Sequence, residues 1–358
     1  MTDYLLCIDG MEGESEPLSF PPQHLKMTGT VRTVPAGAVP DSLGCILRLL
    51  GAQEAELPSG RAAWEAMACG IPVTEHDAFF RCTLCGCDTD GRLYPVPPEA
   101  AERVTGILAQ KQSRTLPEGW CLHQMSGYRS LLRIENAAKR LGGVHTEPPH
   151  QHYGADYRTC LPEGGLLGRR LRQFIADCAA QIPGYVLLPW GQSAYRPLFT
   201  FAGRTGVRAG MVCSAEIVRG LSLALGIACP IIPGTTADVD TDLQAKYWTA
   251  KQLARRYPLV ILHINGCDEA GHRRDAVQKA AFLNRIRREL LIPILDTLRP
   301  GERLLLCSDH QTQSATGKHG TAPVHFWIYE NGFQGKASVL PLISAQEPLR
   351  LLLDRGRD

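Results

Sequence analysis

The sequence lacks an excess of charge of either sign, since 38 Lys and Arg stand against 36 Asp and Glu over 358 residues. Its basic residues are scattered, and no basic block alternates with aromatic residues as a nucleic-acid-binding surface requires. No apolar run approaches the roughly 18 residues that suggest a membrane span. The first residues show neither the charged nor the apolar region of a signal peptide. These absences predict a cytoplasmic protein without nucleic-acid or membrane partners, and they leave its oligomeric state open.

Disulfide bonds are not expected, although the chain has 13 cysteines. Their number is odd and they are dispersed, and Cys7, Cys213 and Cys307 lie within apolar runs, which is typical of small buried thiols in a reducing compartment. Two clusters stand as alternative metal sites, a Cys-x-x-Cys-x-Cys segment without a second half and a proline-rich histidine loop: Cys82, Cys85 and Cys87, and His145, His150 and His152.

Three apolar segments, residues 4–8, 259–264 and 303–307, each lead into acidic residues or histidines. Such runs are typical of parallel strands buried on both faces, and ligand sites collect at the carboxyl ends of these strands. We therefore expect one sheet edge to bring together Asp9, Asp268, His272, Asp309, His310 and His319. Mixed carboxylate and imidazole ligands suit Zn²⁺ or Mn²⁺ better than Mg²⁺ or Ca²⁺.

Asp268 and His272 are four residues apart. They would face the same way if a helix opens at Gly271, so that both could reach one ion.

Ten short motifs follow one another along nearly the whole chain. They are Asp9-Gly-Met11, Pro40-Asp-Ser42, Gly60-Arg61, Phe80-Arg81-Cys82, Gly127-Tyr-Arg129, Leu188-Pro-Trp-Gly191, Gly234-Thr-Thr236, Asp268-Glu-Ala-Gly-His272, Ser308-Asp-His310 and His319. In their residues and order they resemble the alkaline phosphatase superfamily, and within it the archaeal-type cofactor-independent phosphoglycerate mutases.

This resemblance implies an α/β fold with an alkaline-phosphatase-like, mostly parallel sheet flanked by helices and a smaller inserted α/β cap domain. Because the ligand segments lie near both ends of the chain, we expect residues 1–75 and 203–358 to form the metal-binding catalytic domain and residues 76–202 the cap. Helices are expected at residues 98–112, 166–180 and 245–256, and further strands at 128–134, 185–188 and 207–214. Asp240 and Thr241 are expected to cap the last of these helices.

Carried over position by position, the resemblance implies two divalent metal ions, Mn²⁺ or Zn²⁺, with Co²⁺ or Mg²⁺ as alternatives. Asp268, His272 and His319 would bind one ion. The other ion would be bound by Asp9, Asp309, His310 and the hydroxyl of Ser42. Ser42 would be the nucleophile, because a coordinated metal lowers the pKa of a serine hydroxyl and places it in line with phosphorus.

Three arginines, Arg61, Arg81 and Arg129, match family positions and would bind the substrate, because guanidinium groups grip carboxylates bidentately. Arg219 and Lys279 are further basic candidates for the same role.

The implied reaction is the glycolytic interconversion of 3-phosphoglycerate and 2-phosphoglycerate through phosphoserine, without a bisphosphoglycerate cofactor. The chain departs from the family where an acidic residue is replaced by Gly13, an aspartate by Leu43 and a proline by Gln313. Since a fold hosts several reactions, alternatives are a metal-dependent phosphatase, a phosphotransferase for another small metabolite such as homoserine, and a non-catalytic metabolite-binding module.

Overall fold

The computed structural model describes residues 1–14, 20–125 and 127–355, without the side chains of residues 98 and 109–115. The chain forms two compact units, Met1–Leu57 together with Leu198–Asp358, and Pro58–Pro197. The chain thus crosses between units at residues 57/58 and 197/198, whereas the expected boundaries were 75/76 and 202/203. The first crossing lies earlier because helix α2 (Ala62–Ala68) packs against strands of the second unit.

The first unit is built on a seven-stranded sheet in which only one strand, β13, runs opposite to the other six. From edge to edge the strands are β14 (Ser338–Ser344), β2 (Leu25–Arg32), β13 (Val324–Glu330), β10 (Arg303–Cys307), β1 (Asp3–Ile8), β9 (Leu259–Ile264) and β8 (Ala209–Val212). The predicted mostly parallel α/β fold is confirmed. A small hairpin, β11 (Gln311–Gln313) and β12 (Lys318–Gly320), lies outside this sheet.

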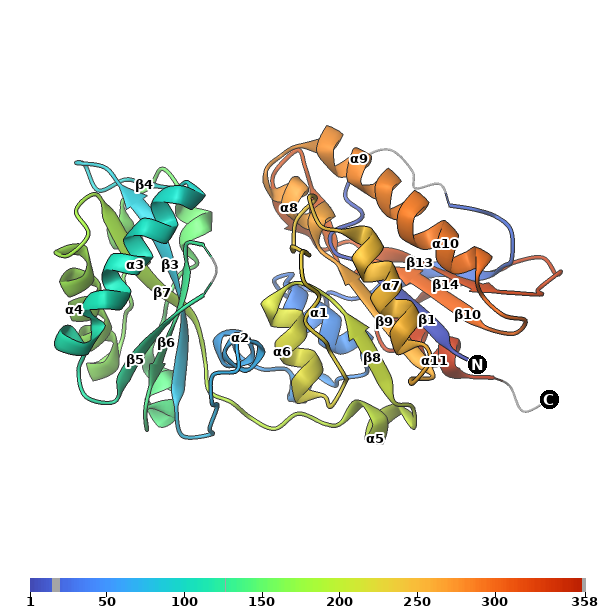
Figure 1. Cartoon of the computed structure of the whole chain (residues 1–358), viewed down its shortest axis with the longest axis horizontal. Helices are drawn as coiled ribbons and strands as arrows, with labels where there is room; N and C mark the ends of the chain where they lie inside the picture. The colour runs from blue at the N-terminus through green and yellow to red at the C-terminus, as the bar shows by residue number, and fades with distance from the viewer. Residues whose placement is uncertain (15–19, 126, 356–358) are drawn as a thin grey trace. The chain divides into compact units, whose positions relative to one another are not determined.

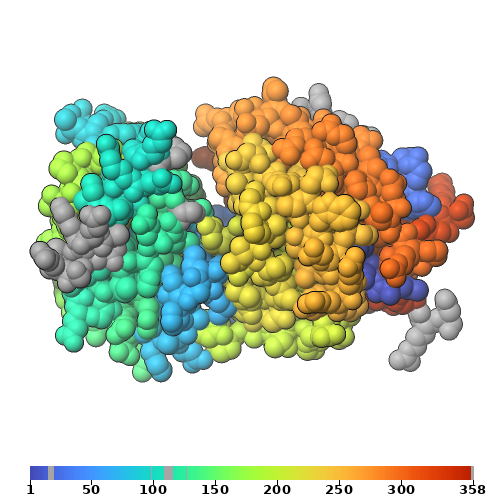
Figure 2. Space-filling model, in the orientation of Figure 1, coloured from blue at the N-terminus to red at the C-terminus, as the bar shows by residue number. Residues whose placement is uncertain are grey.

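Helices cover both faces of the sheet, which explains why its central strands are mostly apolar on both faces. Successive side chains of a strand point to opposite faces. On β1, Tyr4 and Leu6 pack in the core with α7 and α9, whereas Leu5 and Cys7 face α1. Figure 1 shows α7, α9 and α10 lying along the sheet, and in Figure 2 these yellow to orange helices cover its central strands from the viewer.

The helices of the first unit are mostly short. They are α1 (Ser42–Leu49), α5 (Phe201–Thr205), α6 (Glu216–Ala224), α7 (Leu243–Leu253), α8 (Gly266–His272), α9 (Ala276–Ile286), α10 (Ile292–Asp296) and α11 (Glu347–Leu353), with a 3₁₀ turn at Glu54–Glu56 and a π-turn at Arg287–Leu291.

The second unit is a smaller α/β structure with an antiparallel sheet (Figure 1). Its strands are β3 (Ala78–Cys87), β4 (Leu93–Tyr94), β5 (Trp120–Gln124), β6 (Arg129–Ile134) and β7 (Tyr185–Ser193), and its longer helices are α3 (Pro98–Thr115) and α4 (Gly165–Ala179). Short 3₁₀ turns lie at Ala138–Gly143, Pro149–His152 and Tyr157–Cys160. The strand β3 pairs with β4, β6 and β7, so it forms the centre of this sheet.

Two local expectations were wrong. Helix α7 is capped by Asp242, whose side chain accepts a hydrogen bond from the amide of Ala245, while Asp240 bonds to Thr236 instead. Helix α8 begins at Gly266 and ends at His272, so Gly271 lies inside this helix and does not open it. The described ranges contain no helix long and apolar enough to cross a membrane.

Candidate active site

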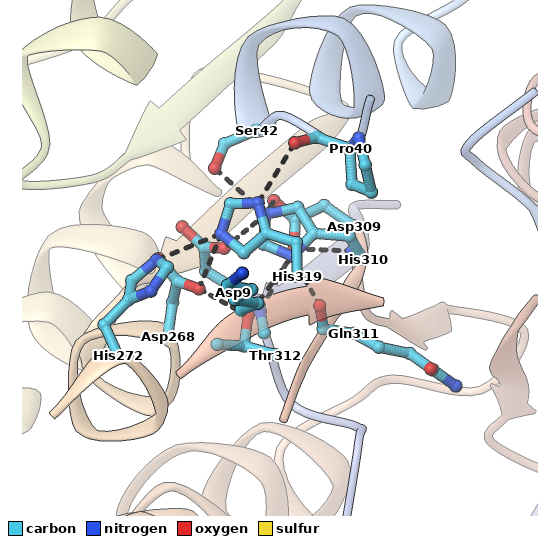
Figure 3. Close-up of polar contacts among 12 residues, drawn as sticks. Asp9, Pro40, Ser42, Asp268, His272, Asp309, His310, Gln311, Thr312 and His319 are labelled. Carbon is cyan, nitrogen blue, oxygen red and sulfur yellow. Dashed lines mark hydrogen bonds and ion pairs between the residues drawn. The ribbon is translucent and has the colours of Figure 1, made fainter. Parts of the chain in front are cut away.

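The carboxyl ends of three adjacent strands place the predicted ligand residues together within the first unit. Asp9 follows β1, Asp309 and His310 follow β10, and the chain leaving β9 enters α8, which carries Asp268 and His272. Helix α1 contributes Ser42 and strand β12 contributes His319 (Figure 3). Within each of two groups, one ligand atom per residue lies within 4.8 Å of the others: Asp9, Asp309 and His310, and Asp268, His272 and His319.

The first group is fully buried, and each of its carboxylates turns one oxygen toward His310. Asp9 accepts a hydrogen bond from the Asn265 amide through Oδ2 at 2.6 Å, and its Oδ1 lies 3.3 Å from Nε2 of His310. Asp309 uses Oδ1 to accept from the backbone amides of Gly10 and His310, and its Oδ2 lies 3.6 Å from the same nitrogen. Among the described residues, neither Asp9 Oδ1 nor Asp309 Oδ2 has a hydrogen-bond partner.

The hydroxyl of Ser42 joins this group. Ser42 is the first residue of α1, and the preceding Asp41 caps the helix by accepting from the amide of Gly44. Its Oγ lies 3.1 Å from Nε2 of His310. The hydroxyl predicted to be the nucleophile thus contacts the same imidazole nitrogen that the two unpartnered carboxylate oxygens face.

The second group is centred on Asp268. His272, one helical turn away on α8, brings Nε2 to 3.3 Å from Oδ2 of Asp268. His319 brings Nε2 to 3.3 Å from Oδ1, and the two imidazole Nε2 atoms are 3.0 Å apart. The three side chains therefore point at one small space.

The orientation of the three histidines is fixed by backbone carbonyl groups. The Nδ1 atoms of His272, His310 and His319 lie 2.9, 3.3 and 3.1 Å from the carbonyl oxygens of Gly317, Gln311 and Pro40. A proton on Nδ1 that is donated to a carbonyl leaves Nε2 with its lone pair, and metal-binding histidines are held in this way. All three Nε2 atoms are therefore ready to act as ligands.

The electrostatics of the two groups differ. Burial, together with the neighbouring charge of Asp309, raises the pKa of Asp9 well above its ordinary value. Burial also disfavours the charge of Asp268, but the contacts with His272 and His319 outweigh it and hold the pKa of this carboxyl well below its usual range. Burial favours the neutral form of His272 and so lowers its pKa. The contact with Asp268 outweighs this effect and raises the pKa of His272 to about 9.

These observations fit a pair of divalent cations. Buried polar atoms are nearly always hydrogen-bonded, so the two unpartnered carboxylate oxygens beside an imidazole nitrogen require another partner. A cation satisfies both oxygens and removes the repulsion between them. Carboxylate, imidazole and hydroxyl donors are also the ligand types expected of Zn²⁺ or Mn²⁺.

Three of the predicted substrate residues gather in the second unit around one buried carboxylate, Glu65. Arg61 and Arg81 contact its Oε1 at 2.8 and 2.7 Å, and both guanidinium groups lie over the ring of Trp190. Burial would raise the pKa of Glu65, but the charges of Arg61 and Arg81, with a smaller contribution from Arg129, lower it overall. Two of the three guanidinium groups thus share one carboxylate oxygen, and the third contributes to its electrostatic environment.

The other two candidate substrate-binding residues, Arg219 and Lys279, lie in the first unit. Arg219, on α6, donates to the carbonyl of Cys229 at 2.7 Å. Lys279, on α9, is 2 % exposed and donates to the carbonyls of Glu12 and Thr312 and to the carboxylate of Glu14. The ammonium group of Lys279 thus joins three segments of backbone, and we assign it a structural role in place of the expected substrate contact.

Three residues of the site were not predicted. Asn265 donates a hydrogen bond to Asp9, and Thr312 donates its hydroxyl hydrogen to Oδ1 of Asp268. The imidazole of His263 lies close to both carboxylates of the first group. His263 could have been found, because it is the single polar residue in the strand of residues 259–264.

The alternative metal sites do not form in the described part of the chain. Ten of the 13 cysteines are buried and none forms a disulfide. Among the described residues, neither Cys82, Cys85 and Cys87 nor His145, His150 and His152 bring three ligand atoms within 4.8 Å of one another.

Comparison with known proteins gives the same relationship as the motifs. Residues 26–182 match the family model described as 2,3-bisphosphoglycerate-independent phosphoglycerate mutase. A protein of that name, numbered 2, from Methanothermobacter thermautotrophicus is 26% identical over 318 residues, which are 83% of this chain and 77% of that protein.

Two solved structures share the fold over their whole length. The PH0037 protein from Pyrococcus horikoshii aligns with a TM-score of 0.77 and 19% identity, covering 100% of this chain and 98% of that one. The cofactor-independent phosphoglycerate mutase from Thermoplasma acidophilum aligns with a TM-score of 0.57 and 13% identity, covering 99% of each.

The paired clusters of carboxylates and histidines thus lie at one edge of a mostly parallel α/β sheet. In sequence the chain is similar to 2,3-bisphosphoglycerate-independent phosphoglycerate mutases of archaea, the resemblance that the motifs indicated.

Proposed function

We propose that this protein is a metal-dependent phosphoglycerate mutase, an isomerase of glycolysis that interconverts 3-phosphoglycerate and 2-phosphoglycerate through a phosphoserine at Ser42. The observation that carries the proposal is the place of the Ser42 hydroxyl, 3.1 Å from His310 Nε2 and beside two carboxylate oxygens that lack partners among the described residues. The names of the relatives, which match most of the chain, support the choice of substrate.

The ligand groups suit Mn²⁺ or Zn²⁺, with Co²⁺ and Mg²⁺ as alternatives. When bound, two such ions supply positive charge to a transferring phosphoryl group and lower the pKa of a coordinated hydroxyl. The residues that would hold them are Asp268, His272 and His319 for one ion, and Asp9, Ser42, Asp309 and His310 for the other.

Ser42 acts as the nucleophile. Its oxygen forms a bond to the phosphorus of 3-phosphoglycerate while the bond from phosphorus to the substrate oxygen breaks, and glycerate is released into the site. Ser42 is the first residue of α1, where the positive end of the helix dipole favours the negative charge of the resulting phosphoserine. The glycerate then reorients, its other hydroxyl takes the phosphoryl group from Ser42, and 2-phosphoglycerate is formed.

A mutase has to retain glycerate between the two transfers. Arg61, Arg81 and Arg129 carry planar guanidinium groups, which bind carboxylates bidentately, so we assign them to the anionic groups of the substrate. A small phosphorylated metabolite in the cytoplasm is the expected substrate.

The test is phosphorus NMR of 3-phosphoglycerate incubated with metal-stripped protein to which Mn²⁺ is returned. We expect 2-phosphoglycerate to appear with the wild type and not with Ser42→Ala. Cys69→Ala, which changes an exposed side chain of the second unit, is the matched control and should keep full activity.

Other outcomes separate the alternatives. Release of inorganic phosphate without 2-phosphoglycerate would make the protein a phosphatase, and the replacements at Gly13, Leu43 and Gln313 are the observations that favour testing this. Transfer to neither product would exclude 3-phosphoglycerate and call for other phosphorylated metabolites. Equal activity of Ser42→Ala and the wild type would exclude Ser42 as the nucleophile.

A further inference from the structure

His263 is the only polar residue of strand β9, and it lies directly beneath the first ligand group. The strand reads Leu-Val-Ile-Leu-His-Ile and pairs with β1, where Cys7 is the register partner of His263. The side chain is 1 % exposed. An imidazole in a central strand of a parallel sheet, buried on both faces, needs a polar partner.

The ring lies between apolar and acidic surroundings. On one side it lines an apolar pocket with Cys7, Ile46 and Met211. On the other side its Nε2 is 3.8 Å from Asp309 Oδ2 and 3.9 Å from Asp9 Oδ2. Within the described ranges, neither ring nitrogen has a partner at hydrogen-bond distance. The carboxylates of Asp309 and Asp9 are thus the polar groups to which the His263 imidazole can donate a hydrogen bond.

The hydrogen bonds already present point to one of these carboxylates. Oδ2 of Asp9 accepts from Asn265 at 2.6 Å, so it has a donor. Asp309 has donors on Oδ1 only, from the amides of Gly10 and His310. Its Oδ2, which faces His310, has none among the residues that the structure describes. His263 is the side-chain donor next to that oxygen.

We propose that His263 is a positioning residue, which donates its Nε2 proton to the carboxylate of Asp309 and so fixes the orientation of the ligand group Asp9, Asp309 and His310. A hydrogen bond to a ligating carboxylate holds it in the orientation that the metal needs. Loss of the residue that donates this bond weakens metal binding by about 10–100-fold. The inference rests on the proposed function only in requiring a cation at this group, and it predicts no effect on the group around Asp268.

The test compares two variants of equal bulk. His263→Gln keeps an amide donor near the position of Nε2, whereas His263→Met fills the space without a donor. His24→Gln, at an exposed turn of the same unit, is the control for replacing a histidine. Binding of Mn²⁺ to the metal-stripped proteins is measured by titration calorimetry, and the unfolding temperature is measured without metal.

We expect the wild type to bind two ions and His263→Met to bind one of them about 10–100-fold more weakly, with the other affinity unchanged. His263→Gln should lie between the two, and the control should match the wild type. A His263→Met protein with both affinities unchanged overturns the proposal. Equal weakening of both ions, together with a lower unfolding temperature without metal, also overturns it, because it indicates a role in the core of the sheet.

A second measurement does not depend on the variants folding. In nitrogen NMR of histidine-labelled, Zn²⁺-loaded wild type, His263 should carry its proton on Nε2, with an N–H signal that shifts when Zn²⁺ is removed. A proton on Nδ1 overturns the proposal. Wild-type protein that binds two ions and converts 3-phosphoglycerate while failing these tests loses only the role of His263, whereas a wild type that binds no ion overturns the proposed function as well.

Discussion

The hydroxyl of Thr312 donates a hydrogen bond to Oδ1 of Asp268, and the surrounding backbone is shaped around that threonine. Thr312 is fully buried. A Cβ atom placed on Gly10 would come within 2.5 Å of its Oγ1, and one placed on Gly271 within 2.7 Å of its Cγ2. The two glycines therefore leave the space that this threonine needs to reach Asp268.

Removing this hydroxyl should weaken the second metal. Thr312→Val keeps the shape of the side chain but loses the donor to Asp268, so we expect about a tenfold or greater loss of affinity for one of two ions. Titration calorimetry with Mn²⁺ measures it. Thr249→Val is the matched control, since the Thr249 hydroxyl bonds only to the backbone of its own helix, at Ala245. Equal affinities in both variants would contradict a positioning role for Thr312.

Removing metal should lower thermal stability. The two ligand groups bind cations only when folded, so an ion present at 100 times its dissociation constant stabilises the fold by about 2.7 kcal/mol. We expect a chelator to lower the unfolding temperature of the wild type and Mn²⁺ to restore it. Asp268→Asn should lose part of this response. A wild-type unfolding temperature that is the same with chelator and with Mn²⁺ would count against both metal groups.

The Glu65 carboxylate should make stability depend on pH. Its pKa is below the ordinary value of 4.5 in the folded protein, because the opposing charges of Arg61 and Arg81 outweigh burial. A group with a depressed pKa stabilises the fold above its unfolded pKa, and this stabilisation is lost as pH falls through the folded pKa. Glu65→Gln should therefore cost about 3 kcal/mol at pH 7. The difference from the wild type should shrink as the pH falls below 4.5.

Urea unfolding of the two proteins at a series of pH values measures this difference. Glu54→Gln serves as the control, because Glu54 pairs with Arg48 but its side chain is 64% exposed, and exposed pairs contribute about 0–1 kcal/mol. A difference between Glu65→Gln and the wild type that stays constant with pH would contradict the assigned direction of the pKa.

Lys279 should matter for stability and not for substrate binding. Lys279→Met leaves the carbonyls of Glu12 and Thr312 without their buried donor, and an unsatisfied buried polar group costs about 1–3 kcal/mol. We expect the free energy of unfolding to fall by that order and the KM for 3-phosphoglycerate to stay unchanged. Lys251→Met, which removes a partly exposed amine, is the control. A raised KM with unchanged stability would return Lys279 to the substrate site.

The fold, and the gathering of Asp9, Asp268 and Asp309 at one sheet edge, could be predicted because both depend on strong, simple patterns. The central strands are mostly apolar since helices cover both faces of the sheet, and Asp9 and Asp309 follow two of these strands closely. The crossing before α2 was missed because nothing in the composition of residues 58–75 separates a helix packed on the second unit from one packed on the first.

The wrong expectation for the cap of α7 arose because two similar residues near its start could fill that role. Asp240 and Asp242 are both good helix caps, and only the position of the first turn of α7 decides between them.

Gly13, a departure from the family, has a φ of +117° and lies where a Cβ would come within 2.7 Å of the Thr312 carbonyl oxygen. A larger residue there would be strained, and the neighbouring Glu12 and Glu14 make acidic contacts instead, with His325 and Lys279.

The central place of β1 in the large sheet has a consequence for synthesis of the chain. Its two neighbours, β9 and β10, lie far downstream, and residues 9–258 separate β1 from β9. At roughly 5–20 residues per second, ribosomes need about 12–50 s to make that stretch. An apolar strand thus waits without its partners while that stretch is made, and no shortened chain that stops before β10 has both edges of β1 paired.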